Sequence, residues 1–317
     1  MLIIETGTTD PWFNLAAEEY FFRKADNDIF ILYINDISVI IGKHQNPFEE
    51  VNIRFLQEQD IPLIRRISGG GTVYHDPGNL NYTYIRNIPD GKKVDFRKYT
   101  QPVITFLNRF AVNAYRGEKN EIRTEGLKIS GNAEHVFKNR LLHHGTLLYS
   151  ADMKLMSECL AAGNAIIESR AVKSNRTDVI NLCDIIKQID NIKDLQKQLF
   201  SFVCETNPFA EEYIISSEDR ESINKIRNEK FRTWEWNYAY GPEFTFYKEF
   251  EIEGLPSSVK LKVAKGIIEE CIFNGPSSWK KLEIILPGTR MVFNDIERVL
   301  LENNLPADTD HVYNFLS

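Results

Sequence analysis

The segment RRISGGGTVYHDPGNLNYTYIR, residues 65–86, restricts the folding of this chain more than any other stretch. Three consecutive glycines at 69–71 precede a β-prone run, and a turn-forming run at 75–79 precedes a second strand-like run. Glycine loses more backbone entropy on ordering than any other residue, so an ordered triplet needs a compensating interaction. Because glycine has no Cβ, its backbone can approach a ligand closely and point N–H groups at phosphate oxygens. The segment therefore predicts a glycine-lined hairpin that binds a small anion.

Arg65 and Arg66 support this prediction, because guanidinium groups suit phosphate and carboxylate. Each feature alone has a simpler explanation: the glycines can form a bulge or a flexible hairpin, and the arginines can lie on the solvent face of a strand. Together with His75, Asp76 and Asn79 in the same expected hairpin, they favour a small-molecule anion site. Two common nucleotide motifs do not explain it, because no GxxxxGK[ST] run occurs and the third glycine of G-x-G-x-x-G is missing.

Composition narrows the class of protein. A chain of 317 residues is long enough for two domains. It has neither an apolar run of membrane-spanning length nor a secretory signal at its start, so we expect a cytoplasmic protein without membrane association. The net charge of −7 argues against a protein that coats nucleic acid. Four widely separated cysteines without zinc-type spacing predict reduced thiols and no structural metal.

A second informative segment is EIRTEGLKISGNAEHVFKNRLLHHGTLLY. Residues 127–130 and 141–149 read as strands of a hairpin, and alternation along the first strand sets the face of Lys128. A single lysine on a strand is most often a solvated surface residue, but the small residues after Lys128 leave room for a ligand. His143 and His144 point to opposite faces, so at most one of them faces a ligand, and that one can equally be a core histidine.

The remaining segments predict an α+β protein. Residues 11–22, 51–59 and 99–115 have helical apolar spacing, and residues 29–34 and 38–42 read as a hairpin. An aromatic, Gly-Pro-containing segment at 233–246 marks a boundary between domains of residues 1–245 and 246–317. In the second domain we expect strands at 248–252, 259–264 and 282–286, and helices at 266–273 and 293–303.

Three motifs in this order resemble a known family. RRISGGGTVYHDPGN, KISGNA and HHGTLLYSAD look like motifs of the lipoate–protein ligases in the biotin/lipoyl ligase superfamily, and AVKSNRTDVINL and WEWNYAYGPEF are also similar to family segments. The resemblance covers the N-terminal two thirds, and the C-terminal part is similar to the accessory domain of such ligases. Thr72 stands where a small residue is frequent and Asn132 where serine is common, and both departures are conservative.

The resemblance implies a large mixed-sheet catalytic domain of the biotin/lipoyl ligase type and a smaller α+β accessory domain. It implies that lipoate attacks the α-phosphate of ATP to give lipoyl-adenylate and pyrophosphate, with Mg²⁺ accompanying the phosphates. A lysine of an acceptor domain then displaces AMP. The implied partners are lipoyl-acceptor domains of 2-oxoacid dehydrogenase E2 subunits or the glycine cleavage H protein, and the ligase itself is expected to be a monomer.

The motifs also imply a set of site residues, with Lys128 as the catalytic residue that bridges the α-phosphate and the lipoyl carbonyl. The implied ATP-binding residues are Arg66, Gly71, Thr72, Val73, Tyr74 and Lys128. The implied lipoate-binding residues are Lys128, Arg66 and Gly70, and further candidates are Ser68, Asp76, Asn79 and His144, with Asp76 the nearest candidate for a magnesium ligand. The chemistry agrees, since two anions ~4 Å apart repel by roughly 4 kcal/mol at an effective dielectric near 20, and a lysine with an arginine offsets that repulsion.

Two other functions remain open at this point. An octanoyltransferase of the same superfamily needs no ATP and passes the acyl group through a nucleophilic cysteine or lysine. None of the four cysteines lies in the three motifs, although Cys159 follows the third one closely. A non-catalytic acyl-binding protein would not need Lys128 for its function. Pyrophosphate release from lipoate and ATP without an acceptor separates the ligase from both.

Overall fold

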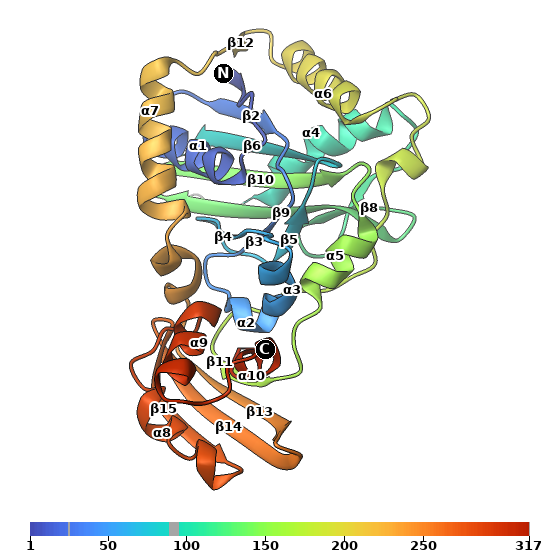
Figure 1. Cartoon of the computed structure of the whole chain (residues 1–317). Helices are drawn as coiled ribbons and strands as arrows, with labels where there is room; N and C mark the ends of the chain where they lie inside the picture. Colours follow the sequence, from blue (N-terminus) through green and yellow to red (C-terminus); the bar gives the residue numbers. More distant parts are fainter. Residues whose placement is uncertain (25, 89–94, 317) are drawn as a thin grey trace. The chain divides into compact units, whose positions relative to one another are not determined.

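The computed structural model describes residues 1–24, 26–88 and 95–316 (Figure 1). It contains two compact units, which are described separately below. The first comprises Met1–Lys43, Ile64–Met153 and Asn175–Arg232, and the second comprises His44–Leu63, Lys154–Ser174 and Thr233–Ser317. Each unit therefore draws on several parts of the sequence. The predicted division into domains of residues 1–245 and 246–317 stays a prediction. Residue 317 lies outside the described ranges.

The first unit is built on a mixed sheet of eight strands in the described part of the chain. Strand β1 runs parallel to β2 and β12, while the remaining neighbours pair antiparallel. The order across the sheet is β12 (Glu211–Glu212), β1 (Leu2–Glu5), β2 (Ile29–Tyr33), β6 (Asn79–Asn87), β10 (Arg140–Leu148), β9 (Leu127–Phe137), β8 (Glu121–Thr124) and β7 (Tyr115–Arg116). The predicted hairpin of the second motif is confirmed as β9 and β10.

Helices cover both faces of this sheet. α4 (Phe96–Asn108) and α6 (Ile192–Thr206) bury their apolar residues against one face, and α1 (Pro11–Lys24) with α7 (Ser217–Ile226) lies on the other (Figure 1). α4 begins at the N-cap Asp95 and ends seven residues earlier than the sequence predicted. Its continuation is blocked because Ala111 and Asn113 adopt positive φ angles.

A smaller sheet has the order β4 (Leu63–Arg65), β3 (Ser38–Ile41), β5 (Val73–His75). This arrangement corrects two predictions. The expected hairpin of residues 29–34 and 38–42 is wrong, because β2 joins the large sheet and β3 pairs with β5. The glycine segment is not a hairpin either, since β3 lies between β4 and β5, and β6 also joins the large sheet. Both β2 and β3 are buried along their whole length, so each needs partners on both edges that a local turn cannot supply.

The second unit contains an antiparallel sheet with the order β11 (Ile166–Ser169), β13 (Phe244–Ile252), β14 (Leu255–Ala264), β15 (Ile267–Asn274). Its described helices are α2 (Pro47–Glu50), α3 (Ile53–Glu58), α8 (Leu282–Ile285), α9 (Phe293–Glu302) and α10 (Thr309–Tyr313), while α5 (Met153–Leu160) begins at the last residue of a first-unit segment. The prediction of a helix at 266–273 is wrong, because Lys265 and Gly266 form a positive-φ turn that returns the chain as β15. The predicted strand at 282–286 is instead α8 and its C-cap, with Leu282 and Leu286 buried on one face four residues apart.

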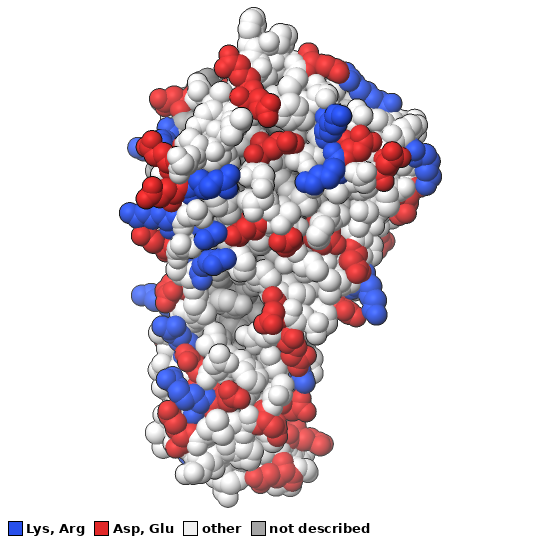
Figure 2. All heavy atoms as spheres, turned by 45° about the horizontal axis from the view of Figure 1, so that its top comes forward, with Lys and Arg blue, Asp and Glu red and all other residues white. Residues whose placement is uncertain are grey.

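Charged side chains of both signs are interspersed over the face of the molecule drawn in Figure 2. Among the described residues, no helix combines the length and apolar character needed to cross a membrane. The positive charges of the glycine segment do not belong to this surface pattern, because Arg65 and Arg66 are both buried. They are part of the interior of the first unit.

Candidate active site

A β-bulge sets the direction of Lys128. In the pairing of β8 with β9, Ile122 faces Ser130 and Arg123 faces Lys128, so Ile129 is an extra residue on β9. A bulge shifts the alternation of side chains by one residue. Lys128 therefore lies on the same face as Gly131, and a Cβ on Gly131 would be 3.2 Å from the Lys128 Nζ. Regular alternation would have placed Lys128 on the opposite face.

The Lys128 amine and Val73, at the edge of the glycine segment, both lie near Gly131. The Cγ1 of Val73 lies 3.9 Å from the same Cβ position on Gly131. Among the described residues, the Lys128 Nζ makes no hydrogen bond or ion pair, and nearby Glu121 is bonded to Arg123 at 3.0 Å. Burial lowers the pKa of the Lys128 amine, and the charges of Arg123 and Arg66 act in the same direction against Glu121. A partly buried ammonium without a carboxylate partner is a suitable site for an anionic ligand.

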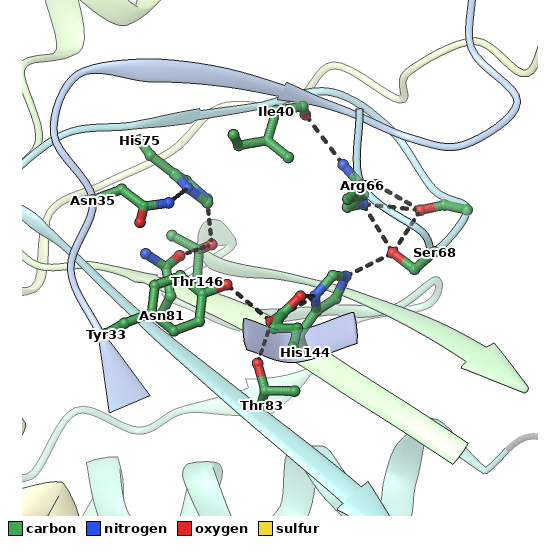
Figure 3. A network of polar contacts seen from close by, with 12 residues as sticks. Tyr33, Asn35, Ile40, Arg66, Ser68, His75, Asn81, Thr83, His144 and Thr146 are labelled. Atoms are coloured by element: carbon green, nitrogen blue, oxygen red, sulfur yellow. Dashed lines mark hydrogen bonds and ion pairs between the residues drawn. The ribbon is translucent and has the colours of Figure 1, made fainter. Parts of the chain in front are cut away.

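Arg66 is directed at its own loop (Figure 3). It donates through Nη2 to the carbonyls of Gly69 (2.6 Å) and Gly71 (2.7 Å), and through Nη1 to the carbonyl of Ile40 (3.1 Å). Burial lowers the pKa of Arg66 to about 10, so it remains charged at neutral pH. Arg65 instead donates to the carbonyls of Gly42 and Lys43. The two arginines thus do not act as a pair, because each anchors a different stretch of backbone.

The glycines of the loop allow close packing. Gly70 has a φ of +87°, which disfavours other residues, and a Cβ there would lie 2.9 Å from the Arg66 Nη2 and 3.4 Å from the Cβ of Ala133 on β9. A Cβ on Gly42 would overlap the carbonyl oxygen of Gly70. The predicted close approach is therefore made first by the protein itself, which places the loop against β9 and beside Lys128.

A second set of polar residues lies behind the loop (Figure 3). The Ser68 Oγ is 2.6 Å from His144 Nε2, and His144 Nδ1 is 3.0 Å from a carboxylate oxygen of Glu18 on α1. Glu18 also accepts hydrogen bonds from Tyr33 (2.9 Å) and Thr83. Burial raises the pKa of Glu18, but His144 and the two hydroxyls together lower it below its ordinary value.

Sequence reasoning named Ser68 and His144 as candidates but missed Glu18. One signal was available: Glu18 stands in the run LAAEEYFF, and helix α1 is buried nearly all round. A carboxylate in such a helix needs partners, because an unpaired buried charge is very costly. Tyr33 and Thr83 carried no comparable signal, since tyrosine and threonine are ordinary strand residues.

The remaining candidates have structural contacts. Asp76 accepts from the backbone N–H groups of Gly78 (2.8 Å) and Asp152 (2.8 Å) and from the Asn79 amide (3.1 Å), so it organises the turn before β6. His75 contacts Asn35 and Thr146, and burial together with the nearby charge of Arg66 lowers its pKa to about 3.

The described residues also offer no group of three or more His, Cys, Asp or Glu side chains that could hold a metal ion. Asp76 would be a single carboxylate ligand whose oxygens already accept backbone N–H bonds, so the described residues do not fit a protein-built magnesium cage.

Comparison with known proteins identifies the family. The model described as "Lipoyl protein ligase A/B catalytic domain" matches residues 10–203. The chain belongs to the lipoyl protein ligase A/B family. This ligase is 37% identical to Lipoate–protein ligase 1 of Staphylococcus aureus over 310 residues, which cover 96% of this chain and 94% of that relative. The sequence-based prediction of a lipoate–protein ligase is confirmed.

Two solved ligases share the fold. A putative lipoate protein ligase from T. acidophilum with bound lipoic acid has a TM-score of 0.62 and 28% identity, covering 74% of this chain and 97% of its own. A structure described as lipoate-protein ligase A bound with ATP has a TM-score of 0.62 and 28% identity, covering 74% of this chain and 96% of its own. The predicted fold class, a large mixed sheet with a smaller additional unit, is confirmed for this ligase.

Proposed function

We propose that this ligase activates lipoate with ATP to lipoyl-AMP and then transfers the lipoyl group to a lysine of an acceptor domain. The observation that supports it most directly is the partly buried amine of Lys128, which has no carboxylate partner among the described residues. That amine and Val73, which follows the glycine loop, both lie within 4 Å of the Cβ position of Gly131. Two anionic reactants need a positive group between them.

In the first step, a lipoate carboxylate oxygen attacks the α-phosphorus and the bond to pyrophosphate breaks. Lys128 bridges the α-phosphate and the lipoyl carbonyl, and stabilises the charge that develops on the phosphorus oxygens. Segment 71–74 holds the nucleotide, and Gly70 borders the lipoate. Arg66 contributes its charge and holds the loop carbonyls inward, which leaves loop N–H groups for the ligands.

In the second step, the ε-amine of an acceptor lysine attacks the acyl carbon and AMP leaves. The adenylate is needed because a lysine of pKa about 10.4 is mostly protonated at pH 7 and a free carboxylate is a poor acyl donor. An archaeal lipoate protein ligase is described in a solved structure together with its E2 lipoyl domain. By analogy, we propose E2 lipoyl domains or the glycine cleavage H protein as acceptors, and a cytoplasmic location.

Magnesium would arrive with the ATP phosphates, since the described residues provide no cage for it. The alternative octanoyltransferase function requires an accessible nucleophile. Cys159, the cysteine that follows the third motif, has a fully buried side chain. Its burial favours the ATP-dependent ligase.

Pyrophosphate release with lipoate and ATP, measured without an acceptor, tests the proposal. We expect wild-type release and a loss of about 10²–10³-fold or more in Lys128→Ala, because the group that faces the developing charge is gone. Lys138→Ala is the matched control, since Lys138 is an exposed lysine at the β9–β10 turn, and it should keep wild-type release. Wild-type protein that transfers an acyl group without releasing pyrophosphate would identify the transferase instead.

A further inference from the structure

The polar residues behind the glycine loop form one continuous chain of contacts. Glu18 on α1, His144 on β10 and Ser68 in the loop come from distant parts of the sequence, and the chain ends at Arg66, whose Nε donates to the Ser68 Oγ at 3.0 Å. Figure 3 shows His144 between the large sheet and Ser68, with Arg66 beyond it. We name these four residues the relay.

We propose that Glu18, His144 and Ser68 are positioning residues that hold Arg66 and the glycine loop in the shape required for adenylation. This proposal rests on the proposed function, because the loop is the element assigned there to ATP and lipoate. Arg66 fixes the loop by donating to the carbonyls of Gly69 and Gly71. Its own direction is set by Ser68, and Ser68 is fully buried with His144 as its partner.

With a neutral His144 imidazole, donors and acceptors along the relay have one consistent order. A guanidinium can only donate, so Ser68 accepts from Arg66 and its own hydrogen is available for His144 Nε2. His144 then carries its hydrogen on Nδ1, where it meets the Glu18 carboxylate. The reverse tautomer would place an unprotonated Nδ1 against a carboxylate and send the Ser68 hydrogen to the Gly69 carbonyl, at 3.4 Å. Glu18 therefore selects the tautomer of His144 that orients Ser68.

The charges along the relay explain why position 18 must carry an ionised carboxylate. Tyr33 and Thr83 donate to Glu18 and keep it ionised in a buried position. Glu18 in turn favours the charged form of buried Arg66. A neutral glutamine would keep the size of the side chain but could present an amide N–H to His144 and invert its tautomer.

A Ser–His–carboxylate arrangement also suggests a nucleophilic serine. Here the Ser68 side chain has no exposed surface, and its oxygen already accepts from a guanidinium. Both features oppose attack on an acyl carbon. An acyl group found covalently on Ser68 after reaction with lipoate and ATP would overturn the positioning role.

The structure provides a matched control in the neighbouring residue pair. His143 and Glu134 are also a buried His–carboxylate pair, at 2.7 Å, but they lie on the other face of the sheet under Phe96 and Tyr99 of α4. Glu134→Gln makes the same Glu-to-Gln replacement beside a buried histidine without touching the relay, and because burial raises the pKa of Glu134 to about 8, it controls for the replacement without loss of a charge at neutral pH. It should leave the kinetics of pyrophosphate release unchanged.

The test compares Glu18→Gln, Ser68→Ala and Glu134→Gln. We expect kcat/KM for pyrophosphate release to fall about 10- to 100-fold in the first two variants, as for loss of a hydrogen bond to a charged group. The change should lie mainly in KM, since the relay shapes the loop but does not touch the reacting atoms. Equal KM values in Glu18→Gln and Glu134→Gln would overturn the proposal.

Two measurements remain informative whatever the activity. ¹⁵N NMR of histidine-labelled wild-type protein should show His144 protonated on Nδ1, and Glu18→Gln should shift this population toward Nε2. Amide hydrogen exchange in residues 66–71 should accelerate in Glu18→Gln and Ser68→Ala but not in Glu134→Gln. A wild-type His144 protonated on Nε2 alone refutes the relay even if Glu18→Gln does not fold. If the wild-type protein releases no pyrophosphate, the proposed function is refuted, whereas histidine NMR and amide hydrogen exchange still test the relay.

Discussion

Replacing Gly131 with alanine should move the Lys128 amine without loosening the fold. The added Cβ would lie 3.2 Å from Nζ and 3.3 Å from Cε of Lys128, while Val73 Cγ1 remains at an ordinary 3.9 Å. Both crowded atoms belong to the free end of a flexible side chain, so a shift of a few tenths of an ångström relieves the contact. The backbone need not move, and alanine restricts the unfolded chain more than glycine does.

The size of the effect follows from this displacement. A misplacement of ~1 Å in a reacting group can cost roughly 10²-fold in rate, so about half of that distance predicts a loss of roughly tenfold in kcat/KM. The free energy of unfolding should change by less than about 0.5 kcal/mol. Pyrophosphate release measures the first quantity and urea unfolding the second.

A control variant should behave in the opposite way. Gly7 has a φ of +67° and no atom within 4 Å of its Cβ position, so Gly7→Ala should lower the stability by about 1–2 kcal/mol and leave the activity of the folded protein intact. Wild-type kcat/KM in Gly131→Ala would show that the Lys128 amine is not displaced. A loss of activity only in proportion to a loss of stability would show that the fold is loosened instead.

Two further variants test the packing and the electrostatics of the first unit. Gly42→Ala should lower the stability by about 1–3 kcal/mol and reduce the activity as well. Its Cβ would overlap the Gly70 carbonyl, which is part of the backbone and cannot turn away. Unchanged thermal unfolding would count against this packing. Burial raises the pKa of Glu134 to about 8, so the folded state keeps a proton that the unfolded state releases, and stability should fall as pH rises from about 6.5 to 8. Glu134→Gln should flatten this slope. For one proton the slope cannot exceed ~1.4 kcal/mol per pH unit. An equally steep slope in the wild type and in Glu134→Gln would show that another group is responsible.

These predictions separate two kinds of glycine in one chain. Gly42 is needed because backbone atoms occupy the space of a Cβ, a Cβ on Gly131 would crowd only the Lys128 amine, and Gly7 is needed only for its backbone angle. The glycine triplet of the loop combines both reasons in Gly70.

The sequence by itself determined the features that depend on near neighbours and on motif identity. The β9–β10 hairpin, helix α9 and the ligase family were all predictable, because turn residues, apolar spacing and ordered motifs are local patterns. Prediction failed where a pattern was ambiguous, as in residues 266–273 and 282–286, since short apolar runs fit either a helix or a strand.

Only the tertiary structure decided how the site residues meet. The bulge at Ile129 depends on the register between β8 and β9, and it places Lys128 on the same face as Gly131. The partner of β3 is a strand beyond the glycine loop, and the partner of His144 is a glutamate 126 residues away. Such contacts form because buried strand edges need hydrogen-bond partners and buried charges need charged or polar partners. Folding brings these partners from distant segments, and no local sequence pattern identifies them.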